Sequence, residues 1–139
     1  VRVLGHFALD RHPNGPRLLA PDRTLGLGDW SGYGYPETCG WATYRTSFVS
    51  PGQSGAAPEA LLLDLGLVHE VCSVYLDERL VAHLFKTPYA VRLEGLPPAT
   101  RHTLRIEVAN GLGNLLQRLR NPSGLYGPVR IWPLLSSAR

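Results

Sequence analysis

The chain has 139 residues and a formal net charge of +3, with 44% hydrophobic and only 18% charged residues. This length suits one domain with its own core, and the apolar content argues against a disordered segment. Together with 15 Gly and 12 Pro, the composition favours a turn-rich β-protein over a helical bundle.

Several partner classes are disfavoured by the residue pattern. No apolar run approaches the ~20 residues that a membrane span needs, and no charged-then-apolar leader opens the chain. Arginines are scattered and Lys86 is the single lysine, so no basic stripe for nucleic acid is predicted. Because the chain contains no Met, even at residue 1, we expect a piece of a larger protein. The compartment is left unknown, with an extracellular or periplasmic location favoured.

The first 26 residues are the least regular part of the chain. A strand is expected over Arg2–Asp10 and a turn over Arg11–Arg17. The first clear alternation spans Trp41–Val49, where Ala42, Tyr44 and Phe48 would face the core.

Period-two alternation continues to the end of the chain. Loops are expected at Ser50–Glu59 and Leu96–Arg101, and a hairpin turn at Asp77–Glu78. Further strands are predicted at Leu61–Gly66, Cys72–Asp77, Arg79–Phe85, Tyr89–Gly95 and His102–Asn110. The pattern predicts one all-β domain over residues 1–139, an antiparallel β-sandwich of the jelly-roll type.

The two cysteines do not indicate a metal site. Cys39 and Cys72 are separated by 32 residues, a spacing unlike that of metal ligands. A disulfide is left open, but a core-facing free thiol at Cys72 is the favoured interpretation, because that residue lies in a predicted strand.

Two distant stretches each join a polar or aromatic loop to an alternating strand. They span Gly28–Phe48 and Asn114–Ile131, and we expect their loops to meet at one edge of the sandwich. Aromatic rings stack on the apolar face of a sugar, while Arg, Asn and Glu hydrogen-bond its hydroxyls. The candidate ligand-binding residues are Trp30, Tyr33, Tyr35, Glu37, Arg118, Arg120 and Asn121.

Each of these candidates has a structural alternative. Trp30 and Tyr35 would equally well plug the end of the sandwich, and exposed arginines are commonly only solvated. Trp41 and Trp132 lie in predicted strands, where packing in the core or between the sheets is expected. Asn110 and Asn114 flank the turn NGLGN and are expected to form it, since Asn and Gly tolerate left-handed backbone angles.

No catalytic constellation is expected. A glycosidase needs two carboxylates about 5 to 9.5 Å apart, and the acidic residues here lie singly in strands, turns and loops. No G-x-S-x-G elbow is present, and the five His are dispersed. His69 and His83 flank a hairpin, where hydrogen-bonded surface or edge positions are expected.

The order of these segments resembles a galactose-binding-like domain over about Leu27–Leu134. It is similar to the sugar-binding β-sandwich of family 2 glycoside hydrolases and the related domain of family 106 rhamnosidases. Cys39, Asp77-Glu78 and Arg101-His102 depart from the residues usual there. The segments that carry the resemblance are CGWATYRTSF, LLLDLG, VHEVCSVYLDERLVAHL, KTPYAVRL, RHTLRIEVAN and PSGLYGPVRIWPL.

The resemblance implies a non-catalytic accessory domain of a glycoside hydrolase. In the resembled family, the loops before the first and the closing strands lean toward the sugar pocket of the catalytic domain. The implied partners are therefore a glycan and the catalytic domain of a parent protein. The alternative is a purely structural sandwich that supports that domain. No cofactor is expected. Some such domains hold a structural calcium, which is left open here, although no cluster of carboxylates in one loop supports it.

Overall fold

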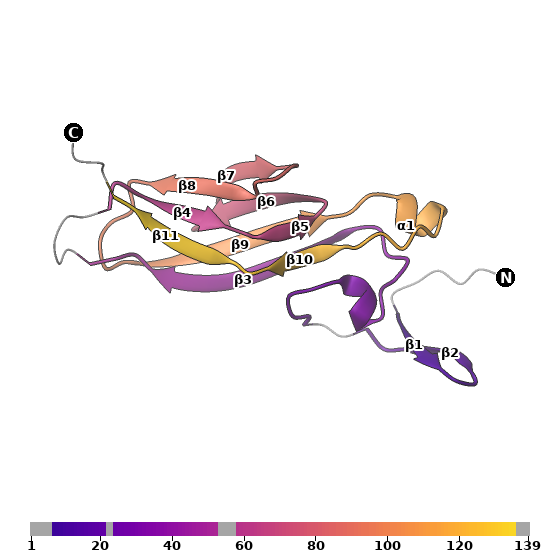
Figure 1. Cartoon of the computed structure of the whole chain (residues 1–139). Helices are drawn as coiled ribbons and strands as arrows, with labels where there is room; N and C mark the ends of the chain where they lie inside the picture. Colours follow the sequence, from indigo (N-terminus) through magenta and orange to yellow (C-terminus); the bar gives the residue numbers. More distant parts are fainter. Residues whose placement is uncertain (1–6, 22–23, 53–57, 136–139) are drawn as a thin grey trace.

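The architecture is that of an all-β sandwich. A computed structural model describes residues 7–21, 24–52 and 58–135. Antiparallel strands dominate, and the larger sheets pack on one another (Figure 1). The predicted fold class is thereby confirmed. The narrower assignment, a jelly roll of the galactose-binding kind, stays a prediction.

The larger sheet has four strands in the order β3–β9–β6–β7. β3 and β9 pair over nine residues, with Trp41 opposite Ala109 and Val49 opposite Arg101. The turn between β6 and β7 is formed as predicted by Asp77 and Glu78, whose φ angles are 48° and 60°. The strand bounds are β3 Trp41–Val49, β9 Arg101–Ala109, β6 Val71–Leu76 and β7 Arg79–Leu84.

The facing sheet has three strands in the order β11–β4–β8, namely Arg130–Leu134, Ala60–Asp64 and Ala90–Glu94. A separate pair joins β10, Gly124–Gly127, to β5, Leu67–His69. Strand β5 was not predicted from the sequence, because three residues are too few to show a period.

The core lies between the sheets and draws on alternate residues of each. Leu61 and Leu63 of β4 meet Cys72 and Val74 of β6 in one buried cluster, which Leu104, Ile106 and Val108 of β9 also enter. The predicted inward face of β3 is confirmed, since Ala42, Tyr44 and Phe48 pack against this cluster.

A hairpin of β1, Ala8–His12, and β2, Gly15–Leu19, precedes the sandwich. It projects from the end of the molecule where α1, Gly113–Leu116, also lies (Figure 1). Part of the strand expected over Arg2–Asp10 falls on residues 1–6, outside the described residues. The range predicted for the turn, Arg11–Arg17, was too long. Only Pro13 and Asn14 form the turn, and the residues on either side of them belong to strands.

Candidate binding site at the junction of two loops

The first loop is shaped by the short 3-10 helix η1, Trp30–Tyr33. Asp29 caps this helix, because its Oδ1 accepts a hydrogen bond from Ser31 N at 3.1 Å. Gly34 ends it with a φ of 90°, and its carbonyl accepts from Leu9 N at 2.8 Å. The loop therefore has a defined shape and also binds the N-terminal hairpin.

The second loop follows α1 and is held by a buried amide. The Oδ1 of Asn114 accepts from Asn121 N at 2.7 Å, and its Nδ2 donates to Asn121 O at 2.9 Å. Between them, Arg118 and Arg120 take left-handed backbone angles, with φ of 52° and 53°. The loop thus carries two exposed arginines on a closed frame.

The two loops meet, as the sequence analysis predicted. Trp30 N donates to Ser123 O at 2.9 Å, and Ser123 N donates to Asp29 Oδ1 at 3.2 Å. The Nε of Arg118 lies 3.8 Å from Glu37 Oε2. Residues about ninety positions apart in the sequence therefore form one surface, which we call the loop junction.

Asn110 joins this junction through its side chain. Its Nδ2 donates to Thr38 O at 2.7 Å and to Ser123 Oγ at 2.8 Å, and its Oδ1 accepts from Gly40 N at 2.9 Å. The structural role expected for Asn110 and Asn114 is correct, but the expected means was wrong. Neither residue adopts a left-handed backbone; instead their amides bridge the loops.

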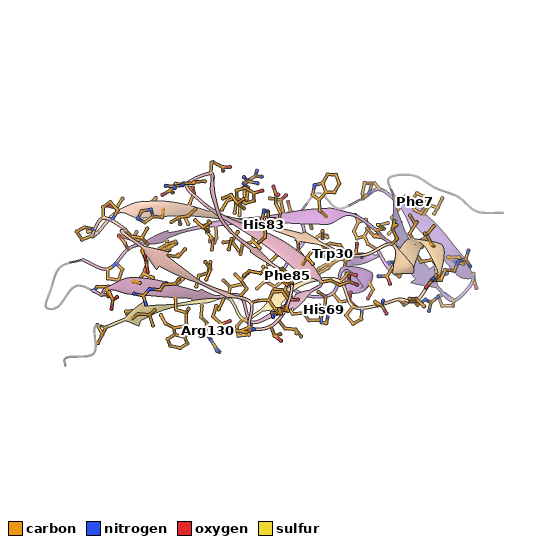
Figure 2. The ribbon with its side chains drawn as sticks, turned by 90° about the horizontal axis from the view of Figure 1, so that it is seen from above. Phe7, Trp30, His69, His83, Phe85 and Arg130 are labelled. Carbon is orange, nitrogen blue, oxygen red and sulfur yellow. The ribbon has the colours of Figure 1, made fainter. Side chains whose placement is uncertain are left out.

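Trp30 is buried, with 3% of its surface exposed. Its indole Nε1 donates to the hydroxyl of Tyr44 at 2.9 Å, and Figure 2 shows it inside the molecule among the strands. This position corresponds to the packing alternative, since a buried ring has no face on which a sugar can stack.

The remaining candidate residues form two groups. Tyr33 and Tyr35 are half-buried; the Tyr33 hydroxyl donates to Leu27 O at 3.1 Å, and Tyr35 packs against the core. The other four lie at the outer side of the junction and form what we call the junction rim. The side chains of Glu37 and Arg118 are 33% and 64% exposed, and the rim is completed by the exposed residues Arg120 and Asn121.

Hydrogen bonds within the junction stabilise a negative charge at Asp29. Burial alone would raise the pKa of this carboxyl, but hydrogen bonds from Ser31 and Ser123 outweigh it and hold the pKa below its ordinary value. Asp29 therefore stays ionised at neutral pH and fixes both loops.

The packing predicted for two tryptophans was wrong. Trp41 and Trp132 lie in strands as expected, but they are 78% and 49% exposed. Each stands on an edge strand, β3 or β11, with its side chain on the face opposite the core. Alternation separates the two faces of a strand, but it does not say which exposed residues lack a covering layer.

A groove of about 930 Å³ runs along β3 at the open edge of the sandwich. Its walls include core residues of both layers, among them Leu104, Ile106 and Ile131. Tyr35 and Trp41 line it as well. The groove therefore begins beside the loop junction, where Tyr35 and Trp41 lie.

The carboxylates that were considered for catalysis have structural partners. Asp64 Oδ1 accepts from Gly66 N at 2.8 Å, and Asp77 Oδ2 lies 2.7 Å from His102 Nδ1. Arg105 forms ion pairs with Glu78 and Glu107. Each of these carboxylates is thus engaged in holding strands or turns together.

The other titratable candidates are also structural. His83 Nδ1 lies 2.9 Å from Ser73 Oγ at the surface, and the ring of His69 makes an edge contact with Tyr126 at a centroid distance of 5.0 Å, as expected for surface or edge residues. Cys39 and Cys72 are free thiols, and Cys72 is buried in the core as predicted.

Over residues 7–21, 24–52 and 58–135, no group of three or more His, Cys, Asp or Glu side chains is placed to hold a metal ion. Over the same ranges, no helix has the length and apolar character required to span a bilayer.

Solved structures provide the only comparison that finds similar proteins. No protein-family model and no curated protein matches the sequence. The chain is similar to part of a rhamnosidase from Novosphingobium sp. PP1Y, with 24% identity and a TM-score of 0.58, over 90% of this chain and 14% of that one. At this identity, the likeness establishes a shared fold.

A weaker likeness is to a GH2 beta-galacturonidase from Eisenbergiella tayi. Its structure with galacturonate matches at 22% identity and a TM-score of 0.49, over 76% of this chain and 18% of that one. Its structure with glycerol matches at 22% identity and a TM-score of 0.48, over 76% and 17%. The chain thus spans less than a fifth of the length of each of these three structures.

Proposed function

We propose that the chain is a non-catalytic accessory domain of a glycoside hydrolase, contacting glycan through the junction rim. The observation that carries this proposal is the meeting of two distant loops, which brings Glu37 beside Arg118. The fold shared with a region of a rhamnosidase supports the parent class, and the structural partners of the carboxylates support a non-catalytic role.

The rim suits polar contacts to sugar. Arg118 offers up to five N–H donors, and its ion pair with Glu37 at 3.8 Å, which is largely exposed, holds it only weakly. Asn121 adds an amide, and its own backbone is already fixed by Asn114. Because the backbone of this edge is fixed, its polar side chains recognise hydroxyls or a carboxylate without the entropic cost of ordering the loop.

A purely structural sandwich is the second candidate, and the burial of Trp30 favours it. The strongest aromatic candidate for stacking anchors its own loop, and many side chains of the junction hydrogen-bond to one another. Under this alternative, the junction would support a neighbouring catalytic domain without affinity for glycan.

A titration of the chain with neutral galactosides, rhamnose-containing oligosaccharides and uronates distinguishes the glycan-binding rim from the purely structural sandwich. If the rim binds, the Arg118→Ala variant should lose about tenfold or more in affinity, since a hydrogen bond from a charged group is removed. Arg79→Ala is the matched control, because this exposed arginine begins β7 at the far end of the sheet. Silence across the panel, with the fold intact by circular dichroism, would favour the structural sandwich.

A further inference from the structure

We propose that the outer face of the four-stranded sheet is a second glycan-contacting surface, with Trp41 as its stacking platform. The ligand class rests on the proposed function, but the surface is separate from the junction rim. None of its residues is among the candidate ligand-binding residues predicted from the sequence.

Trp41 is the most exposed of the large hydrophobic side chains in the described residues, at 78%. Its indole N–H makes no hydrogen bond within that part of the chain, in contrast to that of Trp30. Leaving so large an apolar side chain in water costs free energy that binding would recover. The ring therefore offers both a free face and a free donor.

Strand register places small apolar residues beside this ring. Trp41 is opposite Ala109 on β9, and Ala109 is opposite Val71 on β6. Val71 is itself 42% exposed. Neighbouring strands lie about 4.8 Å apart, so the three residues form one apolar row across the sheet. All three line a shallow groove of about 520 Å³.

A polar row lies about 7 Å further along the strands, which is two residues of rise. On this row, Glu107 is opposite Thr43 on one side and Ser73 on the other, and Ser73 is opposite His83. The Ser73 hydroxyl and His83 Nδ1 are held 2.9 Å apart. Arg105 forms an ion pair with Glu107. These hydrogen-bonding groups are thus fixed in position before any ligand arrives.

The two rows together match a pyranose ring. A sugar has one apolar C–H face and a rim of hydroxyls, so it can stack on Trp41 and bond to Glu107, Ser73 or His83. Phe85, which is 70% exposed, lines the same groove and adds a second aromatic ring to the apolar row, while the polar row follows two residues further along the strands. Glu107, Ser73, His83 and Trp41 line the same groove.

The surface also lies at the end of the sandwich where the loops meet. Trp41 follows Gly40, whose N–H and carbonyl both bond to Asn110 of the junction. A glycan of several residues could therefore contact the rim and the sheet face together, which would strengthen binding through effective concentration.

The opposite face provides a matched control. Trp132 is also an exposed tryptophan on an edge strand, but it belongs to β11 of the other sheet. Figure 2 shows His83 and Arg130 on opposite sides of the sandwich, and Arg130 lies near the Trp132 ring at 6.0 Å. Trp132 thus tests whether any exposed indole would respond to sugar.

The experiment is a ¹H–¹⁵N NMR titration of the whole chain with galactobiose, a rhamnose-containing disaccharide and digalacturonate. The three indole N–H signals are assigned with single Trp→Phe variants. We expect a saturable shift of the Trp41 signal with at least one sugar, while the Trp132 signal stays in place. Trp41→Ala should weaken binding about tenfold or more and Trp132→Ala should leave it unchanged.

Four outcomes would overturn the proposal. The Trp41 signal could stay fixed with all three sugars, or Trp132 could shift equally, which would indicate non-specific contact. Sedimentation could instead show a dimer that Trp41→Ala dissolves, which would assign the face to a second copy of the chain. Binding lost in Arg118→Ala but kept in Trp41→Ala would also reject this surface, while leaving the junction-rim proposal intact.

Discussion

Trp30 and Tyr44 join the first loop to the sandwich, because the indole Nε1 donates to the phenolic oxygen at 2.9 Å. The same oxygen accepts a hydrogen bond from Leu125 N at 3.2 Å. One hydroxyl therefore accepts hydrogen bonds from both the first loop and strand β10. A partly buried side chain from β3 thereby connects the first loop to strand β10.

Replacing this hydroxyl should destabilise the fold. In Tyr44→Phe, the N–H groups of Trp30 and Leu125 lose their acceptor, and we expect a loss of about 1–3 kcal/mol in the free energy of unfolding. Urea denaturation measures it. Tyr33→Phe, which removes a more exposed hydrogen bond to Leu27, is the control and should cost less. Equal effects would mean that the Tyr44 hydroxyl has no special role.

Ser123 is the centre of the junction and is 3% exposed. Its Oγ accepts from Asn110 Nδ2 at 2.8 Å and Asn114 Nδ2 at 3.1 Å. Ser123→Ala should therefore cost about 1–3 kcal/mol and speed amide hydrogen exchange in the second loop. The exposed Ser47→Ala should leave both unchanged, and unaltered exchange in Ser123→Ala would contradict the network.

Gly124 cannot accept a side chain. Its φ is +121°, and a Cβ there would lie 2.4 Å from Gly28 O and 2.7 Å from Trp30 Nε1. Gly124→Ala should destabilise the protein by more than about 3 kcal/mol, through both strain and overlap. Gly95 also has a positive φ, +67°, but open space around it. Gly95→Ala should thus cost about 1 kcal/mol, the backbone strain alone, and thermal unfolding compares the two.

Asp77 should contribute a pH-dependent part of the stability. The hydrogen bond with His102, followed by those from Thr103, holds the pKa of Asp77 below its ordinary value. Because the folded pKa lies below the unfolded one, about 3.9, the stabilisation is present above that pH and is lost as the pH falls through the folded pKa. Asp77→Asn should flatten stability against pH below about 4. If Asp77→Asn left the fall in stability at low pH unchanged, the Asp77 carboxylate would contribute nothing to the pH dependence of stability.

The two thiols should differ in reactivity. Burial raises the pKa of the Cys72 thiol to about 11, whereas Cys39 is half-buried. A thiol reagent at pH 8 should label Cys39 in the native protein and leave Cys72 unmodified. Both should react in denaturant. Failure of either to react there, reversed by a reductant, would reveal a disulfide.

Local pattern was sufficient for most of the sandwich. The alternation in Trp41–Val49 predicted β3 to the residue, and the buried side of β9 followed from Leu104, Ile106 and Val108. The turn at Asp77–Glu78 was likewise readable, because two polar residues there separate two alternating runs. These features depend on neighbours in the sequence, so the sequence contains them.

Short elements and loop partners were harder to predict. The three residues of β5 are specified by pairing with β10 rather than by any period. Asn110 and Asn114 looked like turn formers, since nothing local indicates that their amides would bridge Thr38, Asn121 and Ser123.

By itself, the sequence determined the fold class, the main strands and the set of polar loop residues, because period and composition express local physics. Only the tertiary structure decided that Trp30 is buried while Trp41 and Trp132 are exposed, because burial depends on what covers a face. It also decided that Glu37 meets Arg118, since that distance depends on how the chain returns to its first loop.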